Sequence, residues 1–456
     1  MSSRATSLLV ILSIAGPETL PLTGQTRIDD LMKIKPAYID RFEKNPKERT
    51  VTLEMDFNSP EVMNSGLASL LKGKSISKVE LYYTQFQMAE SFSQPELNRE
   101  RYQELKKLCP DVFKQTFTEW NIIGQTGCRS VTEAKNYFHG FVITYIPAPD
   151  KESMIKEVRG ISKVLSSDSL GHDSEYVTVE VKKKRRTLKT GFFLPRSKRK
   201  LDKGIRYATK SIWHRRPEYY TRIDTVTYKH KHRYFIPSPK AVTFIKKLPD
   251  STIFNVLARH KNWNNISFVC DATGSMAPYT TEIMVWHKLN YATRKAKYFT
   301  FFNDGDDKAD NRKVLGKTGG IYSVDAGDYD AVENTLMSTM KRGSGGDAPE
   351  NNCEAILRSL ADLKEAEEIV MIADNWANVK DLSLASQIKK PVHIILCGAD
   401  NGMINVDYLE LARRTKGTIH TMKEDIDNLS KMSDGETFKF GKKKFRIYAG
   451  KVVACN

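Results

Sequence analysis

The pattern of hydrophobic and polar residues is most regular in the C-terminal half of the chain. Apolar runs at 266–271, 297–303, 368–374, 391–398 and 418–422 alternate with segments of helical spacing at 278–294, 328–341, 349–364, 380–389 and 405–416. Within 349–364, one side of the predicted helix carries the apolar residues Ile356, Leu357, Leu360 and Leu363. Such alternation predicts right-handed crossovers and a parallel sheet with helices on both faces. We therefore predict a doubly wound, Rossmann-like α/β domain over residues 251–430.

The N-terminal half shows a less regular pattern. Residues 79–84 and 138–145 are rich in aromatic and β-branched residues, which is typical of strands. Between them, residues 96–117 have the charge content and apolar spacing of an exposed helix. We predict a smaller α+β domain over residues 20–165, whose sequence indicates no function of its own.

Two further segments flank the predicted sheet domain. Residues 166–250 carry a basic stretch followed by alternating aromatic and basic residues, and are predicted to be a connecting region. Residues 431–456 alternate around Gly441 and Gly450, which predicts a C-terminal β-hairpin. A chain of 456 residues has room for this arrangement of two to three domains.

The first residues have the pattern of a secretion signal. Arg4 precedes an apolar run at 8–12, and residues 13–15 supply the small residues that a signal peptidase requires. We predict a signal peptide over residues 1–16 and an extracytoplasmic protein, periplasmic or secreted. The alternative is the first core strand of a cytoplasmic protein. No later segment reaches the ~18 uninterrupted apolar residues of a membrane span.

The six cysteines are compatible with export but do not establish it. Cys109 and Cys128 lie 19 residues apart in the N-terminal region and are candidates for a disulfide. Cys270 and Cys397 lie inside apolar runs, which is typical of buried thiols. The cysteines do not have the spacing of zinc ligands.

The net charge of +17 is concentrated in one stretch. Ten Lys or Arg and no acidic residue lie between Lys182 and Lys200, so the rest of the chain is only mildly basic. The densest part of this stretch consists of Lys182, Lys183, Lys184, Arg185 and Arg186. Because such a run neutralises phosphates, an alternative function is a nucleic-acid-binding scaffold protein. A charged surface loop or linker is the commoner explanation.

Oxygen-bearing side chains lie in three loops of the predicted domain. Asp271, Thr273 and Ser275 come directly after the first strand, Asp347 follows a glycine run, and Asp374 closes the strand 368–374. In an open α/β sheet, functional groups gather at the carboxyl ends of the strands. An all-oxygen cluster suits a hard cation, Mg²⁺ ahead of Mn²⁺ or Ca²⁺. The alternative for the first group is a helix cap, and for Asp347 a cap before Pro349.

Residues 271–279, Asp-Ala-Thr-Gly-Ser-Met-Ala-Pro-Tyr, resemble the first metal-binding loop of von Willebrand factor A domains, in the subgroup that reads Asp-x-Thr-Gly-Ser-Met-x-Pro-Tyr. The resemblance covers about residues 251–430. It implies a metal-ion-dependent adhesion site with ligands from Asp271, Thr273, Ser275 and Asp374. The family usually has Thr in its second loop, where the best match here is Asp347. The resemblance also implies a function in adhesion, by binding a protein or other macromolecule through the metal face.

The extra carboxylate changes what the site is expected to bind. Three carboxylates around one dication leave a local charge of about −1, which weakens the attraction for an acidic group of a partner. We therefore expect tight retention of the ion and a reduced preference for acidic ligands.

Two other kinds of site are less favoured by the sequence. Asp304, Asp306, Asp307 and Asp310 lack the Gly and terminal Glu of an EF-hand, so we expect a charged, solvated loop. The sequence places no Ser/His/Asp or Cys/His set and indicates no small-molecule substrate. We therefore predict a binding protein and not an enzyme.

Overall fold

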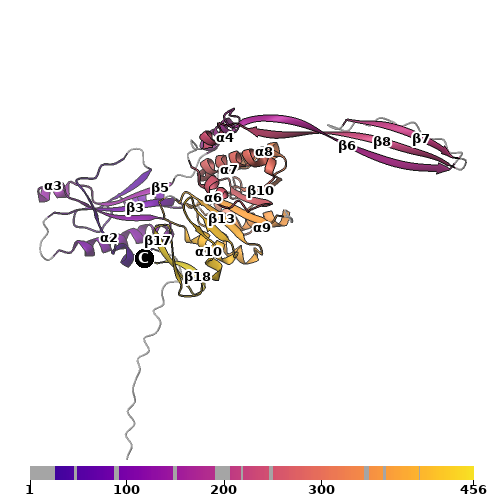
Figure 1. The fold of residues 1–456 in the computed structure, drawn as a ribbon. Coiled ribbons are helices and arrows are strands. Elements are labelled where there is room, and N and C mark those ends of the chain that lie inside the picture. The colour runs from indigo at the N-terminus through magenta and orange to yellow at the C-terminus, as the bar shows by residue number, and fades with distance from the viewer. Residues whose placement is uncertain are drawn as a thin grey trace, which may run out of the picture.

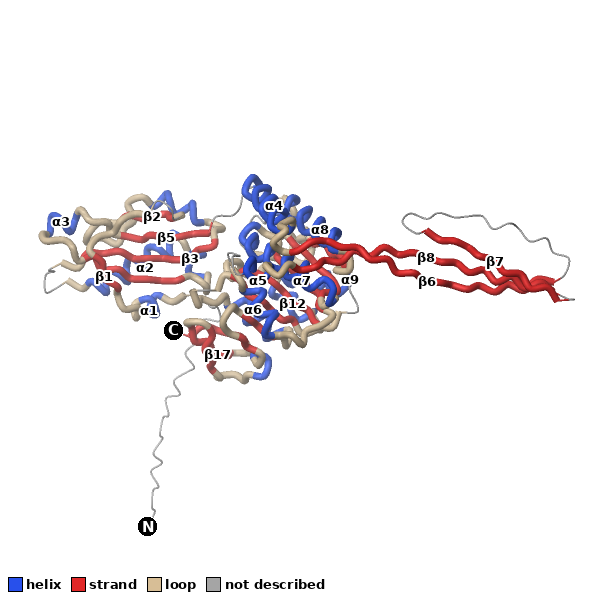
Figure 2. The backbone as a smooth tube through the Cα atoms, turned by 45° about the horizontal axis from the view of Figure 1, so that its top comes forward, coloured by secondary structure: helices blue, strands red, loops and turns tan. Residues whose placement is uncertain are grey.

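The computed structural model describes residues 26–45, 49–86, 92–146, 151–189, 206–216, 219–245, 250–343, 349–362, 366–399 and 401–455. These residues form an N-terminal sheet, a central sheet with helices, a long projecting ribbon and a small C-terminal sheet (Figures 1 and 2). The predicted signal peptide, residues 1–16, lies outside the described residues.

The central sheet has seven strands in the order β11-β10-β9-β12-β13-β14-β15. Its five inner strands are parallel and are β9 (Ile266–Asp271), β10 (Ala296–Phe302), β12 (Glu368–Asp374), β13 (Val392–Cys397) and β14 (Thr418–His420). They confirm the five strands predicted from the apolar runs. The edge strands β11 (Ile321–Asp325) and β15 (Asp425–Ile426) pair antiparallel and were not predicted, because both are short and partly exposed.

Helices cover both faces of this sheet because neighbouring strand residues point to opposite sides. Phe268 and Cys270 pack among α6 (Thr252–Arg259), α7 (Ala277–Asn290) and α8 (Tyr329–Arg342). Val269, between them, packs with α9 (Asn352–Asp362) and α10 (Val406–Arg414). Burial on both faces explains why these strands are continuous apolar runs.

The predicted helix at 380–389 was wrong. This segment contains only a short 3₁₀ helix, η6 (Leu382–Gln387). The Asp381 carboxylate before it accepts hydrogen bonds from the N–H groups of Cys353 and Glu354 at 2.9 and 2.6 Å. Asp381 therefore caps the start of α9, and the few residues before Pro391 leave no room for a longer helix.

The N-terminal sheet has five strands in the order β1-β4-β3-β5-β2. The strands β1 (Ala37–Ile39), β4 (Glu119–Gln125) and β3 (Ser75–Thr84) pair parallel, and β5 (Gly140–Ile146) pairs antiparallel with both β3 and the edge strand β2 (Thr50–Glu54). Helix α2 (Gln94–Leu108) buries Tyr102 and Leu105 in the core with this sheet. The predicted helix over 96–117 is shorter than expected because Pro110 starts a separate 3₁₀ helix, η2 (Pro110–Lys114).

The ribbon consists of three antiparallel strands in the order β6-β8-β7. These are β6 (Gly171–Lys189), β8 (Tyr219–Pro237) and β7 (Arg206–Arg216). Before it, α4 (Lys151–Leu165) packs in the same core as α7 and α8, and α5 (Ala241–Ile245) follows it. Much of the predicted connecting region 166–250 is therefore an insertion in the central unit that projects away from it (Figures 1 and 2).

The C-terminal strands extend the predicted hairpin to three members. The strands β16 (Thr437–Phe440), β17 (Lys443–Tyr448) and β18 (Lys451–Cys455) form an antiparallel sheet. It packs on α10, where the Val452 N–H donates to Glu410 Oε2 at 2.9 Å. The remaining short helices are α1 (Ile28–Leu31), α3 (Val131–Lys135), η1 (Ser65–Leu71), η3 (Gly274–Met276), η4 (Tyr291–Thr293), η5 (Asp310–Arg312) and η7 (Leu429–Lys431).

The N-terminal sheet unit contacts the rest of the molecule through the loop before β4. Thr116 Oγ1 accepts from the Val406 N–H at 3.1 Å, and Lys443 Nζ donates to the Thr116 carbonyl at 2.8 Å. Next to them, the rings of Phe117 and Trp376 meet edge to face with centroids 5.9 Å apart. The two units are therefore joined by both polar and aromatic contacts.

The six cysteines are free thiols in this structure. Cys109 lies in the core of the N-terminal sheet and Cys128 in a separate small cluster, so the two do not form the disulfide that their spacing allowed. Among the described residues, no helix has the length and apolar character needed to cross a membrane.

Candidate functional site

The first loop brings its three predicted residues together at the end of β9. Asp271 is 0 % exposed, and its Oδ1 accepts hydrogen bonds from the backbone N–H and the hydroxyl of Thr273 at 2.8 and 2.7 Å. The Thr273 hydroxyl lies 3.4 Å from Ser275 Oγ, and Ser275 is partly exposed. Asp271 Oδ2 is buried and has no hydrogen-bond partner among the described residues. Asp271 Oδ1 therefore holds the loop through its hydrogen bonds to Thr273, whereas Oδ2 is free to bind a cation.

Asp374 joins the same group from the end of β12. Its Oδ1 accepts from the Trp376 N–H at 2.8 Å, and the Ser275 side chain also hydrogen-bonds to it. Burial raises the pKa of Asp374, and the hydrogen bonds from Ser275 and the backbone oppose this rise. Burial, followed by repulsion from Asp374, raises the pKa of Asp271 to about 8. Both carboxylates are thus deprived of solvent, and the charge of Asp374 further destabilises the anionic form of Asp271.

The predicted second-loop residue, Asp347, lies outside the described residues. The structure instead places Glu350, three residues further on, near the other carboxylates. Glu350 is buried, and burial together with Asp271 and Asp304 raises its pKa well above the usual value. Its Oε2 has no partner among the described residues. Glu350 was not predicted as a site residue, because the resemblance directed attention to Asp347.

Asp304 is a second acidic residue that the sequence did not assign to the site. It follows β10, is 0 % exposed, and its Oδ2 accepts from Lys313 Nζ at 2.6 Å and Lys380 Nζ at 2.7 Å. Burial raises its pKa to about 6 against the effect of both lysines, and its Oδ1 has no partner among the described residues. The expectation of a solvated loop is wrong for Asp304, and also for Asp306, whose carboxylate accepts from Asn303 and Tyr322. The same rule that selected Asp271 and Asp374, a carboxylate at the end of a parallel strand, selects Asp304.

The charges of this cluster do not balance. When ionised, its four carboxylates, from Asp271, Asp304, Glu350 and Asp374, carry −4, and the two lysines that contact Asp304 supply +2. Uncompensated buried charge is strongly destabilising, and one dication would neutralise the remainder. The unpartnered oxygens of Asp271 and Glu350 and the hydroxyls of Thr273 and Ser275 are the hard donors that Mg²⁺ prefers. These residues therefore fit a divalent cation.

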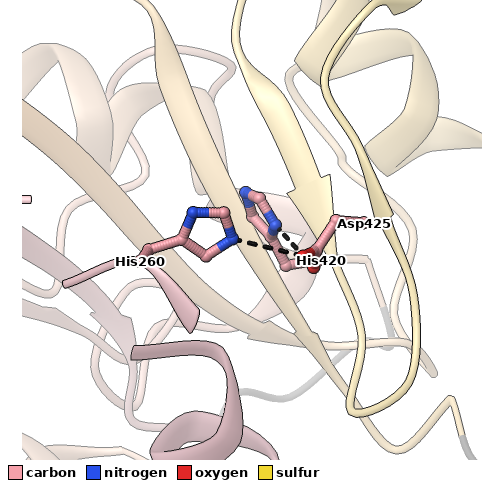
Figure 3. A group of neighbouring side chains, drawn as sticks. All are labelled: His260, His420 and Asp425. Atoms are coloured by element: carbon pink, nitrogen blue, oxygen red, sulfur yellow. Dashed lines mark hydrogen bonds and ion pairs between the residues drawn. The ribbon is translucent and has the colours of Figure 1, made fainter. Parts of the chain in front are cut away.

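Among the described residues, three ligand atoms of His, Cys, Asp and Glu lie within 4.8 Å of one another at His260, His420 and Asp425, whereas the carboxylates around Asp271 do not come that close together (Figure 3). This cluster lies at the β14–β15 edge of the sheet, where His420 ends β14 and Asp425 begins β15. Asp425 Oδ1 is 2.9 Å from His420 Nδ1, and Oδ2 is 3.4 Å from His260 Nε2. Arg259 already contacts both oxygens of Asp425, at 2.6 and 3.0 Å.

Because the Arg259 guanidinium already pairs with both oxygens of Asp425, the cluster is an ion-pair network and not a vacant metal site. Burial lowers the pKa of His420 to about 4. Burial alone would raise the pKa of Asp425, but hydrogen bonds from Arg259 and His420 lower it to about 2. Trp263 stacks on the rings of His260 and His393 with centroids 4.3 and 4.8 Å apart, which fixes the group in place.

The predicted basic residues lie on the projecting ribbon. Lys182, Lys183 and Arg185 belong to β6 and are exposed, whereas the side chains of Lys184 and Arg186 lie outside the described part of the structure. Lys182 forms an ion pair with Glu180 at 3.0 Å. These residues are far from the carboxylate cluster at the end of β9 and belong to a different surface (Figure 1).

Comparisons with protein-family models, with curated proteins and with solved structures found no match for this chain.

Proposed function

We propose that this protein is a metal-dependent binding protein, in which the central sheet is a von Willebrand factor A-type domain and the Asp271 loop holds Mg²⁺. The observation that carries the proposal is the unpartnered, fully buried Asp271 Oδ2 within a cluster of carboxylates and hydroxyls. A buried carboxylate oxygen without a donor costs stability unless a cation or proton compensates it.

Asp271, Thr273 and Ser275 would supply the first-loop ligands, and Asp374 would act directly or through water. Ser275 is partly exposed, so this side of the ion would face a partner. The cation would supply Lewis acidity and a coordination position for an oxygen of the partner. Glu350 and Asp304 add negative charge, which favours a neutral or weakly acidic oxygen ligand over a second strong carboxylate.

The test is calorimetric titration of the full chain with Mg²⁺ after treatment with a chelator. Asp271→Asn keeps the shape of the side chain and removes its charge, so we expect it to lose Mg²⁺ binding. Asp325→Asn is the matched control, because Asp325 also ends a strand of this sheet but is exposed. The proposal fails if Asp271→Asn, folded by circular dichroism, binds Mg²⁺ as tightly as the unmodified protein.

A further inference from the structure

The ribbon formed by β6, β8 and β7 is the feature least explained by the rest of the fold. Its two long strands have 19 residues each and are paired along their whole length, from Gly171↔Pro237 to Lys189↔Tyr219. At about 3.4 Å per residue the ribbon is about 60 Å long. Both figures show it extending away from the central unit (Figures 1 and 2).

The base of the ribbon is fixed firmly to the central unit. Leu170 and Phe235 are buried in the same core as α7, and the Ser238 N–H donates to the Leu170 carbonyl at 2.7 Å. Lys288 Nζ lies 4.9 Å from the centre of the Phe235 ring. The direction of the ribbon is therefore set by packing at its base.

Both faces of β6 are open to solvent in its outer half. Successive strand residues point to opposite faces. Val181, Lys183 and Arg185 share one face and are exposed, Val181 to 54 %. Glu180 and Lys182 share the other face, and their side chains are 47 % and 65 % exposed. A strand that covered a core would be buried at every second residue, so no core lies under this part of the strand.

Most of the net charge of the protein lies in this segment. Residues 171–237 contain 19 Lys and Arg and 6 Asp and Glu, a net +13 of the chain's +17, which leaves +4 for the other residues. Mutual repulsion of this size opposes formation of an uncovered ribbon, and a polyanion would relieve it.

We propose that the ribbon binds a nucleic-acid duplex through its phosphates, without sequence selectivity. Cationic residues on both faces suit a partner that surrounds a thin element, as the walls of a nucleic-acid groove do. A membrane surface touches one face only and favours an apolar face opposite a cationic one. The alternation Glu180, Val181, Lys182, Lys183 in β6 provides no such division.

This inference is independent of the metal site, and its test uses the full chain with a 30-base-pair DNA duplex of arbitrary sequence. The triple variant Lys182→Ala, Lys183→Ala, Arg185→Ala removes three exposed cations from the ribbon. Each phosphate contact contributes about −0.9 to the slope of log K against log salt, so the slope should fall by about 2.7 in magnitude. Between 50 and 200 mM salt, the variant should lose about 40-fold less affinity than the unmodified protein.

The matched control is Lys106→Ala, Lys107→Ala, Lys389→Ala, which removes three exposed cations from the other units and leaves the same net charge. We expect it to keep the slope of the unmodified protein, and chelator to leave duplex binding unchanged. Equal slopes for the two triple variants would overturn the proposal, because net charge and not the ribbon would then govern binding. Absence of duplex binding at 50 mM salt would also overturn it, and so would binding to anionic phosphatidylserine vesicles without duplex binding.

Discussion

Acidification should destabilise the central unit through His420. This residue is 1 % exposed, its Nδ1 hydrogen-bonds to Asp425, and its Nε2 lies 2.5 Å from Thr418 Oγ1. Burial is the largest cause that lowers the pKa of His420 from 6.5 to about 4. Repulsion from His260 and His393 adds to this shift, and the hydrogen bond to Asp425 opposes it. The folded protein therefore holds His420 neutral at a pH where the unfolded chain would protonate it.

The sign and size of the effect follow from proton linkage. Because the folded pKa is lower than the unfolded one, the contribution of His420 is fully present above pH 6.5 and is lost as the pH falls toward 4. Between pH 7 and pH 5, the two pKa values give a loss of about 2 kcal/mol in the free energy of unfolding. Asp425, with a pKa of about 2, stays ionised across this interval.

The assay is urea unfolding at pH 7 and pH 5, followed by tryptophan fluorescence, since Trp263 stacks on His260 and His393. In His420→Gln the difference between the two pH values should shrink by about 2 kcal/mol, because the proton-binding group is gone. Any fixed cost of the substitution cancels in this difference. His172→Gln, at an exposed position on β6, is the control and should keep the full difference. If His420→Gln kept the full difference, protonation of His420 could not be the cause of the acid destabilisation.

Three further predictions concern other buried groups. Lys313→Met should lower the free energy of unfolding by about 3 kcal/mol at pH 7, because it leaves the buried Asp304 with one lysine. The control Lys423→Met, at an exposed lysine, should leave the free energy of unfolding unchanged. Equal urea midpoints for the two variants would contradict this prediction. Gly140→Ala should destabilise the N-terminal sheet, because a Cβ there would lie 2.0 Å from the Leu53 carbonyl oxygen and φ is +124°; an unchanged melting temperature would argue against it. If Asp347 is a ligand, Asp347→Thr should weaken Mg²⁺ binding measured by calorimetry. If Glu350 contributes negative charge that holds the cation, Glu350→Gln should also weaken it. An unchanged Mg²⁺ affinity in either variant would exclude the role of that residue in cation binding.

The sequence predicted the parallel strands of the central sheet well, because strands buried on both faces are unbroken apolar runs such as Ile369–Ala373. Edge strands such as β11 lack that signal, since their burial is partial. The ribbon was missed as a structure because the described residues in the outer half of β6 are exposed on both faces and so show no alternation of buried and exposed residues.

The candidate site was predictable in part for a similar reason. Asp271, Thr273 and Ser275 are close in sequence, so the loop motif was sufficient to group them, and Asp374 followed from its place at the end of a strand. Asp304 also follows a parallel strand and could have been selected by the same rule, whereas Glu350 joins the group through tertiary packing, and Lys313 and Lys380 reach Asp304 from separate loops. No local pattern encodes those contacts.

Trp376 connects the N-terminal sheet unit to the proposed ion site. Its N–H holds Asp374, while its ring contacts Phe117 of the N-terminal sheet unit. When two binding sites are coupled, each changes the affinity of the other by the same free energy. If a bound cation strengthens the contact between Trp376 and Phe117, then docking of the two units strengthens cation binding by the same free energy. Docking of the N-terminal sheet unit would then depend on whether the proposed ion site is occupied.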